Sequence, residues 1–329
     1  MNFLFLLKRS NKVILFTSVF FLTSCQSFKT KPSDKEIGKS PTPSVSATSS
    51  GPAGPIGNQE VNPDLSKDQL PKAPENRIQK VGVIFGPGGA KTYAFIGALK
   101  EMTAQKLPIV AVVGVEFSAL IAAAYSHRLQ TNEVEWQLLK FQEDDIFSRN
   151  YFATESKGAN SAAWKSFLDG FFSQVSLEKF SIPFACPSRN LEKGQVFLLN
   201  RGRGDQVMNY CVPYPPLFKP YNQSVSAIRE IKLSAEFLRR KGAQKILLVQ
   251  ALEKNPRLYS KDQNKAEDII WKEIAYDYSI KNEAIIDEVL YLDTTQVGIM
   301  EFNKKRDIIQ IGQSETKNKL PLILQKWGL

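Results

Sequence analysis

The sequence predicts a three-layer α/β domain over residues 78–329, with a mainly parallel central sheet flanked by helices. Two short apolar runs without polar alternation, residues 80–85 and 109–114, are typical of strands that are buried on both faces of a parallel sheet. A segment with a helical pattern follows each run. Because strands and helices alternate in this order, we expect parallel strands joined by right-handed crossovers.

The expected helices differ in which of their sides are apolar. Residues 93–105 place Phe95, Leu99 and Met102 on one stripe, whereas residues 117–127 are apolar on nearly all sides, which predicts an interior helix. A third segment, residues 160–175, carries large apolar side chains at helical spacing: Trp164, Phe167, Leu168, Phe171 and Phe172. It fits either core packing or a lid or membrane-facing helix.

The N-terminus is typical of an export signal. Lys8, Arg9 and Lys12 precede an apolar stretch, residues 13–22, which is too short to span a bilayer comfortably and is followed by Cys25. The ending Leu-Thr-Ser-Cys resembles a bacterial lipobox, so residues 1–24 are expected to be a lipoprotein signal peptide and Cys25 to carry acyl chains such as palmitate. The alternatives are an uncleaved anchor and an ordinary signal peptide. Gln26, rather than Asp, favours the outer membrane of the cell envelope.

Residues 25–77 are predicted to be a disordered tether that follows the lipidated Cys25. The segment from residue 26 holds eight of the 18 prolines of the chain, with many Ser and Lys residues and almost no aromatic ones. Such a composition cannot bury enough apolar surface to offset its ordering entropy. As a random coil it would span about 40 Å, so the folded domain would be free of the membrane surface but able to return to it.

Composition excludes several classes of protein. The single histidine, His127, cannot supply a His-rich zinc site, three cysteines are too few for a disulfide scaffold, and no cofactor, metal-ligand or nucleic-acid motif is present. The formal charge of +10 falls to +7 without residues 1–24 and to +6 without the tether, which itself carries +1. This modest excess fits attraction to anionic lipid head groups or a general solvated surface charge.

Two turns of the predicted domain could carry chemistry. The loop GPGGAKT, residues 86–92, lies between a strand and a helix, where the backbone N–H groups around Gly86, Gly88 and Gly89, together with Lys91, suit an oxyanion or a phosphate. The turn GVEFS, residues 114–118, has the placement of a nucleophile elbow. Together the two turns are more specific than either alone.

These motifs resemble the opening of a bacterial patatin-like phospholipase domain. That family combines a glycine-rich oxyanion loop with a Gly-x-Ser-x-Gly elbow and a Ser-Asp dyad. The resemblance continues through residues 212–220 (VPYPPLFKP) and 238–246 (LRRKGAQKI), and it reaches the C-terminal segments around residues 299–302 and 309–312, so it covers residues 78–329. It implies a patatin-like fold without a cofactor and a phospholipid or fatty acyl ligand.

The sequence departs from the family at each chemical element of the site. The resemblance puts Glu116 at the position of the nucleophilic serine and Ser226 at that of the dyad aspartate, while Pro87, which has no N–H, takes a glycine position in the loop. A carboxylate has no proton to give as a nucleophile, and a serine is no base for a dyad. We therefore expect no intact catalytic residue and a non-catalytic lipid-binding or regulatory module, a pseudoenzyme.

Two other functions remain open from the sequence. The first is a lipid acyl hydrolase with an atypical site, in which Glu116 acts as a general base if burial raises its pKa. The second is a structural or partner-binding envelope lipoprotein with a closed cleft. Ser118 is interpreted as a small residue that allows close packing, and Asp205 as a helix N-cap. An exported domain permits a disulfide between Cys186 and Cys211, but the sequence does not place their Cα atoms within reach.

Overall fold

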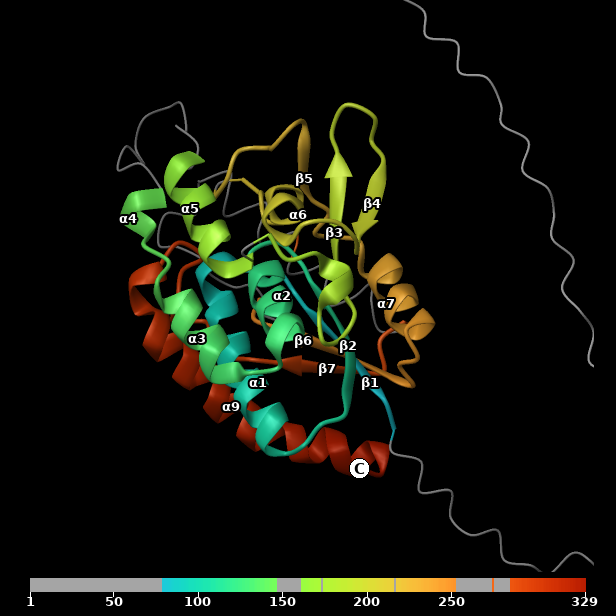
Figure 1. The fold of residues 1–329 in the computed structure, drawn as a ribbon. Helices are drawn as coiled ribbons and strands as arrows, with labels where there is room; N and C mark the ends of the chain where they lie inside the picture. Colours follow the sequence, from blue (N-terminus) through green and yellow to red (C-terminus); the bar gives the residue numbers. More distant parts are fainter. Residues whose placement is uncertain (1–78, 147–160, 173, 216, 253–273, 275–284) are drawn as a thin grey trace, which may run out of the picture. The chain divides into compact units, whose positions relative to one another are not determined.

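The computed structural model describes residues 79–146, 161–172, 174–215, 217–252, 274 and 285–329 (Figure 1). All of them belong to one compact unit, Pro71–Leu329. The predicted signal peptide, Cys25 and the tether to residue 77 lie outside the described residues. Among the described residues no helix is long and apolar enough to cross a membrane, and no group of His, Cys, Asp or Glu side chains could hold a metal ion.

A seven-stranded sheet forms the centre of the described part of the chain, in the order β4-β3-β2-β1-β6-β7, with β5 also paired to β3. The pairs within β3-β2-β1-β6-β7 are parallel, and β3 pairs with β4 and β5 in antiparallel fashion. The mainly parallel sheet predicted from the sequence is confirmed. The strands are β1 (Val81–Phe85), β2 (Ile109–Gly114), β3 (Phe184–Asn190), β4 (Val196–Leu199), β5 (Ser224–Ser226), β6 (Lys245–Gln250) and β7 (Glu288–Tyr291).

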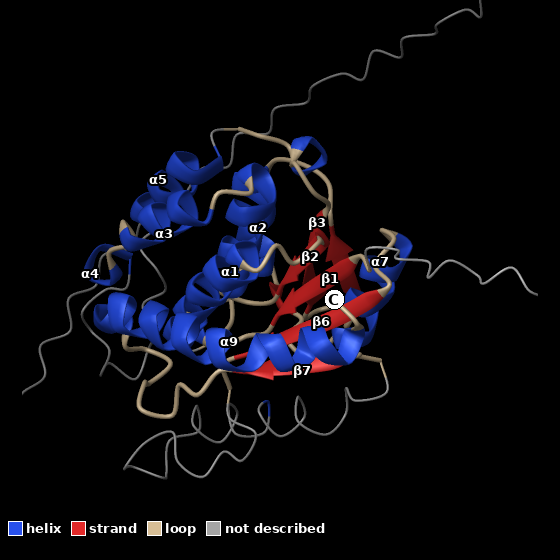
Figure 2. Ribbon diagram, turned by 90° about the horizontal axis from the view of Figure 1, so that it is seen from below, coloured by secondary structure: helices blue, strands red, loops and turns tan. Residues whose placement is uncertain are grey.

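Helices cover both faces of this sheet. Figure 2 shows α1, α2, α3 and α9 on one side and α7 on the other. The helices are α1 (Ala94–Ala104), α2 (Ser118–Arg128), α3 (Thr131–Leu139), α4 (Glu143–Ile146), α5 (Ser161–Phe172), α6 (Gly204–Cys211), α7 (Ile231–Arg240) and α9 (Lys305–Trp327), with 3-10 turns at Gly89–Tyr93, Leu177–Lys179 and Phe302–Lys304. The chain thus forms the expected three layers.

The unbroken apolar runs of the strands have a direct explanation in these layers. In β1, Val83 and Phe85 contribute to the core under α1 and α2, whereas Ile84 contributes to the core under α7. Leu247 and Leu248 of β6 divide between the two cores in the same way. Because successive side chains point to opposite faces and both faces are covered, each position must be apolar.

Helices α1 and α9 pack with their backbones in contact. A Cβ atom on Gly97 of α1 would lie 2.0 Å from the carbonyl oxygen of Ile309, and one on Gly312 of α9 would lie 1.9 Å from that of Ala94. Neither position accepts a side chain unless a backbone moves. This contact holds the C-terminal helix against the segment that leads out of the glycine-rich loop.

The structure decides between the two interpretations of the segment at residues 160–175. Trp164, Leu168, Phe171 and Phe172 of α5 are buried in the core on the α1 side of the sheet. Trp164 also packs on Phe218, with ring centroids 4.9 Å apart. Core packing, rather than a lid or a membrane-facing helix, therefore accounts for the aromatic pattern.

Candidate functional site

The glycine-rich loop and the GVEFS turn meet at one edge of the sheet. Phe85, the last residue of β1, pairs with Gly114, the last residue of β2, so the two strands end side by side. The N–H of Val115 donates to the carbonyl of Phe85 at 3.1 Å, which continues the pairing into the turn. Both turns thus leave the carboxyl ends of neighbouring parallel strands, the edge where α/β proteins usually bind ligands.

Glu116 lies at the apex of the sharp turn between β2 and α2. Its φ of 61° lies in the left-handed region, which a side-chain-bearing residue seldom occupies. The turn is tight because Gly114 brings the chain against α2: a Cβ atom there would lie 2.5 Å from the Cα of Ala119. A strained residue held by its surroundings at the apex is the geometry of a nucleophile elbow, here with glutamate at the apex.

The Glu116 carboxylate accepts the hydrogen bonds that the glycine-rich loop offers. Oε2 accepts from the N–H of Gly89 at 2.9 Å and from that of Gly88 at 3.1 Å. Gly88 and Gly89 both have positive φ values, 156° and 54°, and this backbone shape aims their two N–H groups at one point. Glu116 and both glycines are buried, so a negative group of the protein itself takes the anion-binding donors.

Burial dominates the electrostatics of this carboxyl group. It raises the pKa of Glu116 from 4.5 to about 7, while the backbone N–H groups of Gly89, Phe117 and Gly88 lower the pKa and offset part of the effect. Removal from water disfavours the charged form, and donors to the carboxylate favour it. Oε2 can accept the two hydrogen bonds in either protonation state.

Ser226 reaches the apex from a different part of the sheet. It ends β5, where it pairs with Ser188 of β3, and its side chain is buried. Its Oγ accepts the backbone N–H of Glu116 at 2.9 Å. The structure thus brings together Glu116 and Ser226, which lie 110 positions apart in the sequence. The serine, however, contacts the main chain of the apex residue rather than its reactive group.

Other loop residues take structural roles. The N–H of Gly86 donates to the carbonyl of Val249 at 2.9 Å, and the buried Lys91 donates from Nζ to the carbonyl of Thr294 at 3.0 Å. Of the four loop residues considered for anion binding, Gly88 and Gly89 therefore hold the Glu116 carboxylate. Gly86 and Lys91 instead tie the loop to the segments at Val249 and Thr294.

Ser118, which was singled out in the sequence, supports the elbow. Its Oγ accepts the N–H of Val115 at 2.9 Å and lies 2.8 Å from the carbonyl oxygen of Phe85.

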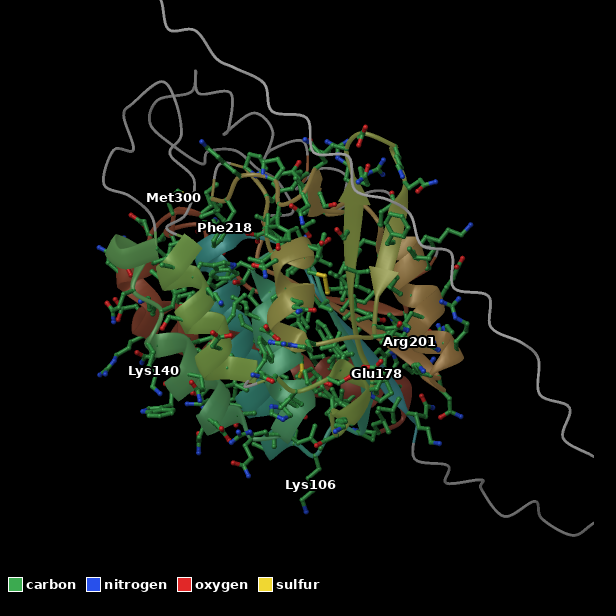
Figure 3. The ribbon with its side chains drawn as sticks, turned by 45° about the horizontal axis from the view of Figure 1, so that its top comes forward. Lys106, Lys140, Glu178, Arg201, Phe218 and Met300 are labelled. Atoms are coloured by element: carbon green, nitrogen blue, oxygen red, sulfur yellow. A yellow bond between two sulfur atoms is a disulfide. The ribbon has the colours of Figure 1, made fainter. Side chains whose placement is uncertain are left out.

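The two cysteines of the domain are bonded to each other. A disulfide joins Cys186 of β3 to Cys211 of α6, with an S–S distance of 2.02 Å and Cα atoms 5.7 Å apart. A disulfide is drawn in yellow in Figure 3.

The predicted N-cap at Asp205 is wrong. Helix α6 begins at Gly204 and its N-cap residue is Arg203, so Asp205 lies in the first turn. There its carboxylate forms an ion pair with Arg203, with Oδ2 2.7 Å from Nη2. An acidic side chain in the first turn still favours the helix through the dipole, but without an N-cap hydrogen bond.

The glycine-rich loop is covered from outside by two segments. A Cβ atom on Gly89 would lie 2.4 Å from the carbonyl oxygen of Ile299 and 2.9 Å from Cδ1 of Leu217. Their chain neighbours Met300 and Phe218 are found at the same end of the molecule in Figure 3. Glu116 is 0% exposed and both glycines are buried, so the two N–H donors are covered in the described part of the chain.

A cavity of about 330 Å³ lies on the Ser226 side of the elbow. Three segments line it: Arg189 and Leu191, then Tyr214, Pro215 and Pro220, then residues 225–229. Neither Glu116 nor a residue of the glycine-rich loop is among them. Two of these segments, residues 212–220 and Ser226, carry part of the resemblance seen in the sequence, but nothing in the sequence shows that they meet around a cavity.

Comparison with known proteins covers part of the chain that forms this site. A search of curated proteins gives no match to the chain. The family model for patatin-like phospholipase matches residues 83–231, a segment that includes the glycine-rich loop, Glu116 at the elbow and Ser226. The chain therefore contains a patatin-like phospholipase domain at residues 83–231.

Proposed function

We propose that this domain is a non-catalytic member of a lipid acyl hydrolase family and serves as a lipid-binding or regulatory module of the bacterial cell envelope. Acyl chains on Cys25 would anchor it in the membrane, in agreement with the lipobox-like ending of residues 22–25 and with the tether that follows. Several acyl chains make attachment effectively permanent, because one chain alone binds only marginally.

One observation carries the proposal: Glu116 Oε2 accepts the N–H groups of both Gly88 and Gly89. In an acyl hydrolase such donors stabilise the charge that develops on the substrate oxygen, and loss of one donor costs about 10²–10³ in rate. Here both donors already bond to a carboxylate of the protein. That carboxylate also stands where the hydroxyl nucleophile would be, so the dyad mechanism loses its nucleophile and its oxyanion donors through one substitution.

Ser226 removes the remaining element of the dyad mechanism. Its hydroxyl is no base at neutral pH, and its Oγ already accepts the main-chain N–H of Glu116. The contact stabilises the strained apex, because it pairs a buried N–H that would otherwise need another partner. The substitutions at positions 116 and 226 thus form one self-consistent structural unit.

The pKa of Glu116 favours a second candidate, hydrolysis by general-base activation of water. A carboxyl group with a pKa of about 7 suits a base that works near neutral pH. The geometry opposes this candidate, because Glu116 is buried and does not line the cavity beside it. A water molecule and an ester carbonyl would both need access that the described residues close.

Hydrolysis assays on the full chain separate the two candidates. The substrates are a short-chain nitrophenyl ester and phosphatidylcholine vesicles, and the variants are Glu116→Gln and the pair Glu116→Ser with Ser226→Asp. We expect no turnover above buffer for the wild type and for Glu116→Gln. Turnover by the wild type that Glu116→Gln abolishes would establish the general-base hydrolase and refute the pseudoenzyme.

The double variant tests how far the architecture has diverged. Any esterase activity that it gains would show that the site lacks only these two side chains, which supports the proposal. The anchor has its own test: the wild type should incorporate labelled palmitate and Cys25→Ser should not. A wild type without label, or equal label in Cys25→Ser, would refute the lipid anchor.

A further inference from the structure

Strand β4 lies at one end of the central sheet. It pairs with β3 on one side, and within the described residues no backbone segment bonds to its other side. Figure 1 shows the hairpin of β3 and β4 extending beyond α7, with β4 on its outer side. A strand at the edge of a sheet offers a row of backbone N–H and C=O groups with which a further strand can pair.

The pairing of β4 with β3 decides which backbone groups face outwards. The N–H of Asn190 donates to the carbonyl of Gln195 at 2.9 Å. Hydrogen-bonded pairs alternate with non-hydrogen-bonded pairs along an antiparallel ladder, so the next hydrogen-bonded pair is Ser188 with Phe197. The backbone of Phe197 is therefore directed towards β3.

The residues on either side of Phe197 have the opposite orientation. The N–H and C=O groups of Val196 and Leu198 point away from β3, and none of them bonds to another backbone segment among the described residues. Pro187, which has no N–H to give, pairs with Leu198, in agreement with a position where no ladder bond forms. The outer side of β4 thus presents two donors and two acceptors, placed symmetrically about Phe197.

The side chains of β4 do not protect this edge. Residues 194–200 (GQVFLLN) include no charged residue and no proline, and β4 pairs with β3 through four consecutive residues without a bulge. Phe197, at the middle of the outer row, is 46% exposed. Lysine, proline and bulges are the usual features that prevent edge strands from pairing with other chains. The edge is therefore open to another apolar strand.

We propose that β4 pairs with β4 of a second copy of this chain, antiparallel about a two-fold axis at Phe197. In this register Val196 of each copy exchanges both hydrogen bonds with Leu198 of the other, so every outward group of these residues gains a partner. The two Phe197 side chains meet at a non-hydrogen-bonded position, where facing side chains are closest. The sheets of the two copies then form one continuous sheet.

Two features favour a second copy over a foreign strand. The edge is complementary to itself in hydrogen bonds and at Phe197, and two strands without charge meet without repulsion. The segment before residue 79 would hold two copies on one membrane with a reach of about 40 Å, which raises their local concentration. Only this second feature rests on the proposed function, through the lipid anchor at Cys25.

Sedimentation equilibrium of the full chain in neutral detergent tests the pairing. All proteins carry Cys25→Ser, so acyl chains cannot cause association and the result does not depend on the anchor. We expect a reversible equilibrium between monomer and dimer. Phe197→Lys should weaken the dimer at least about tenfold, because it removes an apolar contact and places two positive charges opposite each other. Leu322→Lys, at a position of α9 that is 67% exposed, should leave the dimer unchanged.

A second variant removes hydrogen bonds without adding charge. Val196→Pro deletes an outward N–H that the pairing with β3 does not use, and proline is accepted on edge strands at such positions. The dimer loses one hydrogen bond from each copy, so we expect it to weaken about tenfold. Circular dichroism of each variant checks the fold.

Cysteine cross-linking tests the register. Phe197→Cys, again with Cys25→Ser, brings two thiols together across the axis, since facing Cβ atoms of such a pair are about 4.5–5.5 Å apart, close to the spacing in a disulfide. Cys186 and Cys211 are bonded to each other, so the new thiol is the one that reacts. We expect a disulfide-linked dimer on air oxidation, and much less of it for Leu322→Cys.

Three results would overturn this inference. They are a chain that stays monomeric up to about 0.2 mM, folded Phe197→Lys or Val196→Pro that associates as tightly as the parent, or Phe197→Cys that cross-links no more than Leu322→Cys. The outcome is separable from the tests of the proposed function. A monomeric chain whose wild type incorporates palmitate would refute the pairing and keep the anchor, and a dimer without palmitate would do the reverse.

Discussion

Comparison of the wild type with Glu116→Gln measures how the buried carboxyl group changes the free energy of unfolding with pH. The folded-state pKa of about 7 lies above the reference value of 4.5. The difference, 7 − 4.5 = 2.5 pKa units, corresponds to about 3 kcal/mol at 1.36 kcal/mol per unit. Glutamine keeps an oxygen acceptor for Gly88 and Gly89 but does not titrate.

The sign of the effect follows from proton binding. Between pH 4.5 and pH 7 the folded protein keeps the Glu116 proton that the unfolded chain has lost, so the stability of the wild type falls as pH rises through this window. Below the window the carboxyl group is neutral in both states. Above the window the ionised carboxyl group lowers the unfolding free energy of the wild type by the full amount of about 3 kcal/mol.

Urea unfolding of the wild type and Glu116→Gln at matched pH values between about 4.5 and 8 measures this effect, since the other titrating groups are shared and cancel. We expect the difference in unfolding free energy between the two proteins to change by about 3 kcal/mol in favour of Glu116→Gln as pH rises. A difference that stays constant with pH, or that changes in the opposite direction, would refute the buried carboxylate at the loop.

Three other substitutions test separate contacts. Glu116→Ala leaves two buried N–H groups without their carboxylate, and acetate can take its place. Sodium acetate at roughly five times the Kd of acetate for this variant should raise its unfolding free energy by about 1 kcal/mol relative to sodium chloride at equal ionic strength. The wild type should gain much less. Gly312→Ala should cost at least about 2 kcal/mol in urea unfolding, because its new methyl group meets backbone of α1, whereas Gly170→Ala, with nothing within 4 Å, should be neutral or slightly stabilising. Loss of the disulfide in Cys186→Ala with Cys211→Ala should cost roughly 3 kcal/mol, since the bond closes a loop between cysteines 25 positions apart; equal urea midpoints for this pair and wild type would contradict it.

The sequence was sufficient for the fold class because its strongest signals are local. The run at residues 109–114 predicts β2 with the bounds that the structure has, and the apolar segment at residues 117–127 predicts α2 within one residue at each end. Both elements are buried on most sides, so their composition alone reports their position. The N-cap of α6 was missed because the difference between Arg203 and Asp205 depends on backbone angles at the helix start.

The arrangement of the site depends on contacts that no local pattern carries. The resemblance to patatin-like domains related Glu116 to Ser226, but the direction of the glutamate side chain depends on the N–H groups of Gly88 and Gly89, and Gly89 in turn lies against Leu217 and Ile299. From the sequence alone, a carboxylate at the apex shows only that the hydroxyl nucleophile is replaced. In the structure it bonds to the loop donors itself.

The cavity could not be predicted for a related reason. Its walls are brought together by the antiparallel pairing of β5 with β3 and by the proline-rich segment between α6 and β5. Arg189 and Arg229 lie 40 positions apart, and each alone has the pattern of an ordinary surface charge. That both line this cavity is seen only when the register of β3 and β5 is known.

The central claim is that the Glu116 carboxyl group occupies the N–H donors of Gly88 and Gly89. Amide proton shifts of these two glycines, followed by NMR over a pH titration of the full chain with selectively labelled glycine, test it most directly. We predict that both amide signals move together with a midpoint near pH 7 and that the movement disappears in Glu116→Gln. Amide signals that do not respond to pH, or that respond equally in Glu116→Gln, would contradict the claim.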